Sequence, residues 1–189
     1  GLDVARFGTD KSVLTGLKGW KQVGRKPMAK KDTNEVVGET INFIEANYPP
    51  DMKIRLAVDG GFGHGVIDVL RERKADKSAD NERAARILQN VEILEVNFGS
   101  TDWILRHYGF KDEASRQTKK NDRAVQESRE NYSNFKAEMF DFLRRDLSKH
   151  IQLLPDKVYS QQLPTIITIP DSKGRLQIES KEKYKDRTG

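Results

Sequence analysis

The pattern of apolar and polar positions predicts a parallel strand–helix–strand unit near the middle of the chain. Residues 54–58 and 91–96 form two compact and mostly apolar runs, which are typical of strands buried on both faces. Between them, a helix is predicted to begin near Gly65, with apolar residues at helical spacing as far as Leu70. Strand, helix and strand at this spacing indicate a βαβ unit, and hence parallel pairing of the two strands.

The amino-terminal segment predicts a hairpin. A short strand ends near Asp3 or Val4, a turn follows at Gly8, and a second strand runs through Val13 and Leu14. The basic segment that comes next contains Pro27, which predicts a break in any strand there.

A helix is predicted from Asp32 or Thr33 to about Tyr48. The run Asp-Thr-Asn-Glu supplies a capping residue at its start, and Pro49 and Pro50 end it. The apolar residues Val37, Ile41 and Ile44 recur at helical spacing and are expected to be buried.

The carboxyl-terminal half predicts an amphipathic helix and a second hairpin. The helix begins near Ser133 and is expected to bury one face, formed by Phe135, Met139, Phe142, Leu143 and Leu147. The hairpin arms are residues 165–169 and 175–179, with Gly174 suited to a left-handed turn position. Two polar segments, about 74–90 and 100–131, are interpreted as insertions outside the core.

Composition fits a single domain of 189 residues, with 35% hydrophobic and 33% charged residues. The absence of cysteine excludes disulfides and thiolate sites and suits a reducing cytoplasm. No apolar run is long enough for a membrane span, and the first residues show no secretory leader. The start without methionine suggests a piece of a larger protein.

The charge pattern is compatible with a polyanionic partner. The formal net charge is +5, and six basic residues occur between positions 18 and 31 without a single acid. We expect cations of this run to line a DNA path, although a solvated hairpin loop is the simpler explanation. The run comprises Lys18, Lys21, Arg25, Lys26, Lys30 and Lys31.

Two aspartates, Asp3 and Asp59, stand at the ends of predicted strands, and glycines follow Asp59 at positions 60, 61 and 63. Carboxylates that converge at one edge of a mixed sheet suit Mg²⁺ or Mn²⁺. Two such ions about 4 Å apart can activate water and stabilise the leaving oxygen of a phosphodiester. The alternative is that both aspartates are ordinary turn or cap residues.

Five segments, in order, resemble the nuclease domain of phage terminase large subunits. Residues 1–12 (GLDVARFGTDKS) resemble the start of that domain, and residues 56–70 (LAVDGGFGHGVIDVL) resemble its second acidic motif and the helix behind it. Residues 96–99, 134–139 and 176–185 resemble its third core strand, its long helix and its last hairpin arm with the basic segment that follows.

The resemblance implies an α/β, RNase H-like fold: a mixed central sheet with helices on both faces. It implies a metal-dependent endonuclease that uses two Mg²⁺ or Mn²⁺ ions to cut concatemeric viral DNA during packaging. Asp3 and Asp59 would be its catalytic and metal-binding acids, with a third acid expected beyond Gly189. The residues expected to contact DNA are Lys21, Arg25, Lys26, Lys30, Lys31, Lys181 and Lys183.

The resemblance also implies a cellular setting and partners. These are double-stranded DNA, an ATPase motor domain of the same polypeptide, the portal and the small terminase subunit, in the cytoplasm of a phage-infected or prophage-carrying bacterium. No phosphate-binding loop of a motor domain occurs in the sequence. Three alternatives stay open: an ATP-binding domain of the actin and sugar-kinase type, a catalytically silent DNA-binding or docking module, and a junction resolvase.

Overall fold

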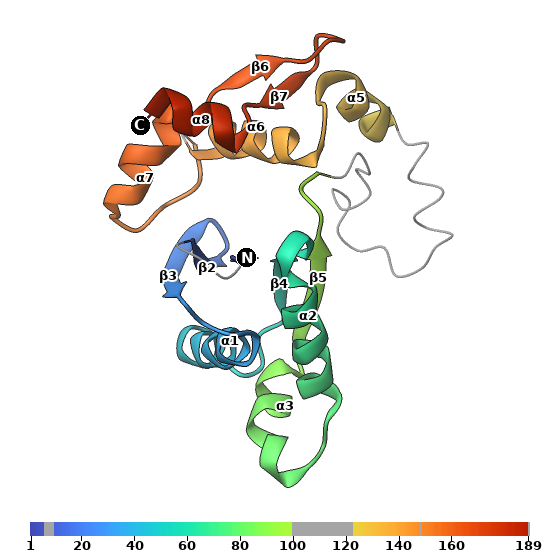
Figure 1. Cartoon of the computed structure of the whole chain (residues 1–189). Coiled ribbons are helices and arrows are strands. Elements are labelled where there is room, and N and C mark those ends of the chain that lie inside the picture. Colours follow the sequence, from blue (N-terminus) through green and yellow to red (C-terminus); the bar gives the residue numbers. More distant parts are fainter. Residues whose placement is uncertain (6–9, 100–122, 148, 189) are drawn as a thin grey trace. The chain divides into compact units, whose positions relative to one another are not determined.

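The computed structural model describes residues 1–5, 10–99, 123–147 and 149–188 (Figure 1). The chain divides into two compact units, residues 1–97 with 152–154, and residues 98–151 with 155–189. Elements of the first unit are β1 (Leu2–Asp3), β2 (Lys11–Lys18), β3 (Lys21–Ala29), α1 (Thr33–Asn47), β4 (Ile54–Asp59), α2 (Gly60–Ala75), η1 (Ala79–Asn81), α3 (Glu82–Leu88) and β5 (Val91–Val96). Elements of the second unit are α5 (Arg123–Asn131), α6 (Phe135–Leu147), α7 (Lys157–Gln162), η3 (Leu163–Thr165), β6 (Thr168–Pro170), β7 (Leu176–Ile178) and α8 (Lys181–Thr188).

A five-stranded mixed sheet organises the first unit, with strand order β3-β2-β1-β4-β5. The first three strands pair antiparallel, whereas β1, β4 and β5 pair parallel. The helices α2, η1 and α3 connect β4 to β5, which pair in parallel, and this confirms the predicted βαβ unit. The predicted α/β class, with a mixed central sheet flanked by helices, is therefore confirmed.

The start of α1 is fixed by a local hydrogen-bond exchange. The Asp32 carboxylate accepts from the Glu35 backbone N–H at 2.8 Å, and the Glu35 carboxylate accepts from the Asp32 N–H at 3.0 Å. This capping box satisfies the backbone N–H groups of Asp32 and Glu35 in the first turn of the helix. The helix ends at Asn47, before Pro49 and Pro50, so both predicted boundaries are confirmed to within a residue.

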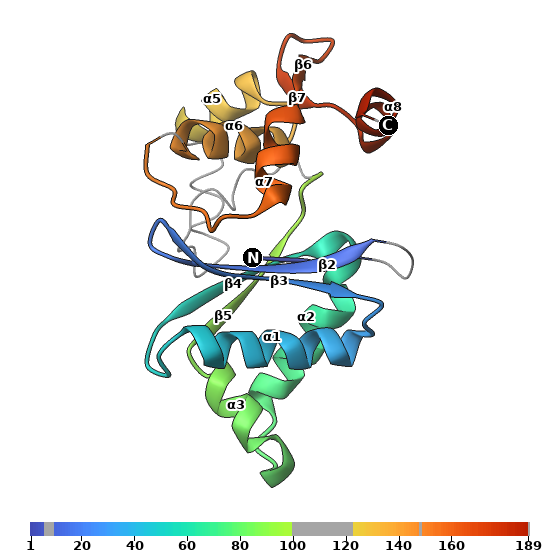
Figure 2. The same cartoon turned by 90° about the vertical axis from the view of Figure 1, so that its left-hand side faces the viewer.

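The core of the first unit lies between its sheet and its helices. Figure 2 shows α1 and α3 on the same side of the sheet. Leu14, Val58 and Leu70 are almost completely buried there, together with the predicted residues of α1. Residues 74–90 contribute to this core, because Leu88 at the end of α3 is fully buried in it. The expectation that this segment lies outside the core is therefore wrong for α3.

A second correction concerns Pro27, which lies within β3 and pairs with Val13 instead of breaking the strand. Proline is tolerated because β3 is the edge strand of the sheet, where one side of the backbone needs no partner. The basic run is thus mainly strand. Near Lys21 the outer edge of β3 is covered, since the Gln22 N–H donates to the Gln152 carbonyl at 2.8 Å.

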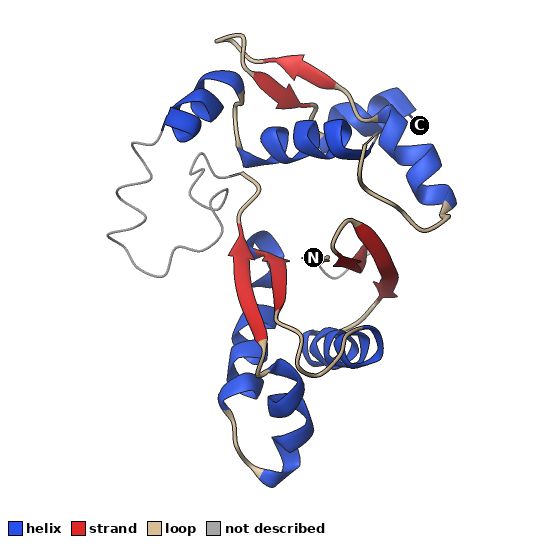
Figure 3. Ribbon diagram, turned by 180° about the vertical axis from the view of Figure 1, so that it is seen from behind, coloured by secondary structure: helices blue, strands red, loops and turns tan. Residues whose placement is uncertain are grey.

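The second unit contains α6 and the predicted hairpin (Figure 3). Strands β6 and β7 pair antiparallel, and Gly174 has a φ of 76°, as the turn prediction required. The buried side of α6 differs from the expectation. It includes Glu138 and Asp141, whereas Met139 and Phe142 are only half-buried. Hydrogen bonds from Ser128 to Glu138 and from Tyr132 to Asp141 explain why these acids point inward.

Candidate functional site

Strand register brings Asp3 and Asp59 next to each other. Leu2 on β1 pairs with Val58 on β4 in parallel, so the following residues, Asp3 and Asp59, stand on adjacent strands at the same level. Leu2 and Val58 are buried on the helix side of the sheet. Because side chains alternate along a strand, Asp3 belongs to the opposite side. We call this side the acidic face; it also carries Val13, the direct partner of Asp3 on β2, and Thr15.

Asp59 is also the N-cap of α2. Its Oδ1 accepts a hydrogen bond from the Gly61 N–H at 3.0 Å, which holds the carboxylate at the carboxyl end of β4. A carboxylate has further lone pairs beyond the one used by this bond, so capping does not prevent metal coordination. The capping interpretation and the metal interpretation of Asp59 are therefore compatible.

A third carboxylate, Glu95, lies close to the start of α2. A Cβ built on Gly60 would come within 2.9 Å of Glu95 Oε1, so the missing side chain at Gly60 makes room for it. His64 Nδ1 lies 3.4 Å from the same oxygen. Sequence reasoning did not select Glu95, because an isolated acid near the end of an apolar strand carries no distinctive signal.

The donors present suit a hard divalent cation but do not complete its coordination. Across residues 1–5, 10–99, 123–147 and 149–188, no three His, Asp or Glu side chains gather closely enough to hold a metal ion. Asp3 and Asp59 offer carboxylate oxygens, the donor type that Mg²⁺ and Mn²⁺ prefer. A further ligand from outside these ranges is needed for a site of the two-metal type.

The basic residues of the first unit that are expected to contact DNA form two groups, and those of the first group pair with acids of α1. Lys26 pairs with Glu39 of α1, and Lys31 donates to Glu35 at 2.7 Å. The hydrogen bond with Lys26 is the main reason that the pKa of Glu39 is lowered. Lys21 and Lys30 are exposed, and Arg25 pairs across the strands with Thr15, which places it on the acidic face.

The remaining two, Lys181 and Lys183, belong to α8 in the second unit. Lys183 is exposed, whereas the side chain of Lys181 lies outside the described part of the chain. The role of all seven residues in DNA binding stays a prediction.

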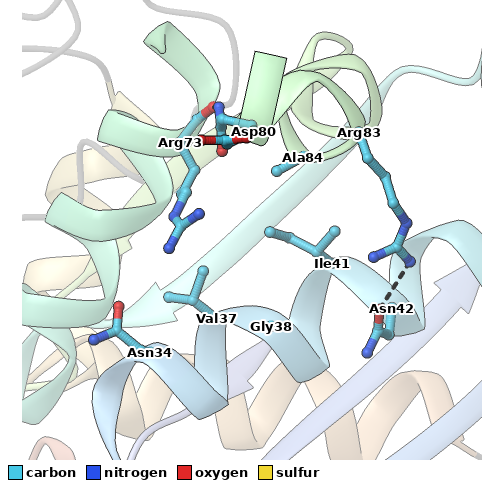
Figure 4. Close-up of a pocket in the computed structure, with 10 residues that line it drawn as sticks. Asn34, Val37, Gly38, Ile41, Asn42, Arg73, Asp80, Arg83 and Ala84 are labelled. Carbon is cyan, nitrogen blue, oxygen red and sulfur yellow. Dashed lines mark hydrogen bonds between the residues drawn. The ribbon is translucent and has the colours of Figure 1, made fainter. Parts of the chain in front are cut away.

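A pocket of about 310 Å³ lies among α1, α2 and α3, and its lining includes neither candidate acid. Figure 4 shows Arg73 and Arg83 above an apolar floor that includes Val37 and Ile41. Arg83 donates to the Asn42 carboxamide at 2.9 Å and pairs with Glu45, so one of the two guanidinium groups is already engaged. With no paired acids, this pocket lacks the chemistry of the edge that carries Asp3 and Asp59.

Within the described ranges, no helix has the length and apolar character needed to cross a bilayer. No family model matches the sequence, and no curated protein matches it. Several solved structures are similar to the structure of this chain. The nuclease domain of the large terminase subunit gp2 of bacterial virus Sf6 superposes with a TM-score of 0.63 at 13% identity, over 98% of this chain and 78% of that one.

Two further structures of the Sf6 protein show the same likeness. A K428A mutant with calcium gives a TM-score of 0.61 at 12% identity, over 100% of this chain and 79% of that one. A K428A mutant of the nuclease domain with manganese and beta-thujaplicinol gives 0.60 at 13% identity, with the same coverage. The chain therefore has a terminase nuclease-like fold.

Proposed function

We propose that this chain is a metal-dependent DNA endonuclease with Asp3 and Asp59 as catalytic acids. The observation that carries the proposal is the placement of these two carboxylates side by side on parallel strands of a terminase nuclease-like sheet. K428A mutants of the Sf6 protein have been solved with manganese and with calcium, which supports a divalent metal here.

In the proposed reaction, Asp3 and Asp59 would hold Mg²⁺ or Mn²⁺ at the carboxyl edge of β1 and β4. Bound metals would lower the pKa of a water molecule and neutralise charge on the phosphodiester. The first turn of α2 fixes Asp59 through the Gly61 N–H, so the ligand is oriented before DNA binds. The exposed Gly61 leaves the backbone accessible beside this carboxylate, which favours close approach of a phosphate.

The biological role we propose is cutting of concatemeric viral DNA during genome packaging. The substrate would be double-stranded DNA, and a third acid beyond Gly189 would complete the two-metal site. An ATPase motor domain in the same polypeptide, the portal and the small terminase subunit would be its partners. Because the proposed contacts are metals and backbone-directed cations, we expect little sequence preference.

The test is plasmid nicking in Mn²⁺ and Mg²⁺ by the chain, and by a version extended past Gly189 along its natural coding sequence. The informative variant is Asp59→Asn, because asparagine also caps helices but removes the negative charge that binds metal. Asp32→Asn is the matched control, since it makes the same change at the cap of α1. We expect nicking to be lost in Asp59→Asn and retained in Asp32→Asn.

The other outcomes distinguish the alternatives. Folded extended protein that cleaves in neither metal would refute the nuclease proposal. ATP binding by that protein would then favour the actin and sugar-kinase type, and DNA binding that survives Asp59→Asn would favour a docking module. Cleavage that prefers branched DNA would instead indicate a junction resolvase.

A further inference from the structure

Lys11, the first residue of β2, lies on the acidic face beside Asp3. Asp3 pairs directly with Val13. Lys11 is two residues from Val13 along the same strand and therefore projects from the same side of the sheet. The intervening Ser12 projects from the other side and is buried.

This arrangement places Lys11 within reach of the candidate metal site. Diagonal neighbours across an antiparallel pair are separated by about 7–8 Å, which a long side chain can span. Lys11 also lies toward the correct end of the sheet. Because β2 runs antiparallel to β1, Lys11, the first residue of β2, lies beyond Asp3 at the carboxyl end of β1. The Ala5 N–H donates to Ser12 Oγ at 3.0 Å, which confirms that the chain after Asp3 continues alongside this end of β2.

The charge on Lys11 is available for a ligand. Its side chain is exposed, and within the described part of the chain it forms no ion pair. The contrast is with Lys26 and Lys31, whose charges are paired with acids of α1.

We propose that Lys11 binds a phosphate of the DNA strand that lies at Asp3 and Asp59. This inference rests on the proposed nuclease function and adds a substrate-binding residue to the same site. Two acids alone would repel a polyanion, and a lysine ammonium is a compact charge well suited to a phosphate oxygen. Lys11 thus favours binding of the DNA backbone near the acids and gives no base preference.

The test compares Lys11→Ala with Lys53→Ala. Lys53 is also exposed and precedes β4, so it lies at the amino end of that strand, the end opposite Asp59. Affinity for a short linear duplex is measured in Ca²⁺ at several salt concentrations, and nicking is measured in Mn²⁺. Lys11→Ala should reduce the slope of log K against log salt by about 0.9, the value for one lost phosphate contact. It should also raise KM for DNA, because one charge-assisted contact to a phosphate is lost.

Lys11→Arg should restore both the slope and KM, because it keeps the charge, and Lys53→Ala should match the unchanged protein. If Lys11→Ala does not fold, Lys11→Gln replaces it, and thermal unfolding of each variant verifies the fold. Equal slopes and KM values for the Lys11 and Lys53 variants, in a chain that cleaves DNA and loses cleavage in Asp59→Asn, would overturn the role of Lys11 alone. Absence of metal-dependent cleavage in the unchanged, extended chain would instead refute the nuclease function on which it rests.

Discussion

Lys26 on β3 forms an ion pair with Glu39 on α1, while the residue before it, Arg25, lies opposite Thr15 on the acidic face. Two adjacent cations of one strand therefore point to different sides of the sheet. Lys26 connects the sheet to the helix that covers it. Arg25 shares the side that carries Asp3, so of these two cations Arg25 is the one that we expect to meet a substrate there.

This difference predicts unequal effects on DNA binding. Arg25→Ala should weaken binding and reduce the salt slope by about 0.9 for one phosphate contact. Lys26→Ala should leave the slope unchanged, because its charge is paired with Glu39. Anisotropy titrations of both variants over a salt series check the prediction, and an equal loss of slope in the two variants would contradict it.

Metal binding should stabilise the fold in a way that depends on Asp59. A ligand that binds only the folded state at about a hundred times its Kd adds about 2.7 kcal/mol to the free energy of unfolding. We expect Mn²⁺ to raise the thermal midpoint of the unchanged chain and of Asp32→Asn, and EDTA to reverse the rise. Asp59→Asn should show no rise, and an equal rise in this variant would argue against Asp59 as a ligand.

Gly16 on β2 allows close packing of α1 against the sheet. A Cβ at this position would lie 2.8 Å from Phe43 Cε1 and 2.5 Å from the Tyr48 hydroxyl. Gly16→Ala should therefore destabilise the first unit by about 1–3 kcal/mol through overpacking. Gly38→Ala in α1 is the control, because its Cβ meets nothing within 4 Å. Gly38→Ala should raise the free energy of unfolding by about 0.5–1 kcal/mol, because alanine favours the helix more than glycine does. Urea denaturation measures the free energy of unfolding of both variants.

Tyr132 and Asp141 form a buried hydrogen bond of 2.7 Å in the second unit. Burial and this bond raise the pKa of Tyr132 to about 12. Burial acts to raise the pKa of Asp141, but hydrogen bonds from Tyr132 and Arg144 outweigh it, and the net pKa is lowered. Tyr132→Phe should cost about 1–3 kcal/mol, since it leaves a buried carboxylate with one donor fewer.

The pH dependence follows from the lowered pKa of Asp141. Its stabilising contribution is fully present above the unfolded value of 3.8 and is lost as the pH falls through the lower folded pKa. The gap in unfolding free energy between Tyr132→Phe and the unchanged chain should thus be largest above pH 3.8 and narrow below it. Tyr184→Phe, which removes a bond to the Thr165 hydroxyl, should show a smaller gap without this narrowing.

Local signals were the part of the fold that could be predicted from sequence. The start of α1 depends on a hydrogen-bond exchange between Asp32 and Glu35, which are three residues apart. The turn at Gly174 likewise depends on one residue and its φ angle. Such features need no information from distant parts of the chain, which is why their positions were predicted closely.

The predictions that the structure contradicts concern residues whose environment depends on distant parts of the chain. Pro27 by itself predicts a break in a strand, but its place in the edge strand, which only strand order reveals, makes proline tolerable there. Leu88 stands in a polar segment, yet α3 packs it into the core beside α2. Glu138 and Asp141 are polar residues on the buried side of α6, and their partners Ser128 and Tyr132 come from the preceding segment.

The candidate site depends partly on local sequence signals and partly on tertiary contacts. Asp3 and Asp59 are predictable from sequence because each ends a strand, and an apolar run followed by a polar residue indicates a strand end. The proximity of Lys11 to Asp3 depends on the pairing register of β1 and β2. A shift of one residue would move Lys11 to the opposite side, and the sequence of a hairpin does not determine its register with that precision.

The position of Pro27 has a consequence for how copies of the chain behave at high concentration. An edge strand with free backbone donors invites strand addition from neighbouring molecules, which is a common route to aggregation. Residues 152–154 cover part of the outer edge of β3, and proline offers no N–H farther along the same strand. This edge is therefore a poor template for intermolecular sheets, which helps many copies to remain dispersed when they crowd together.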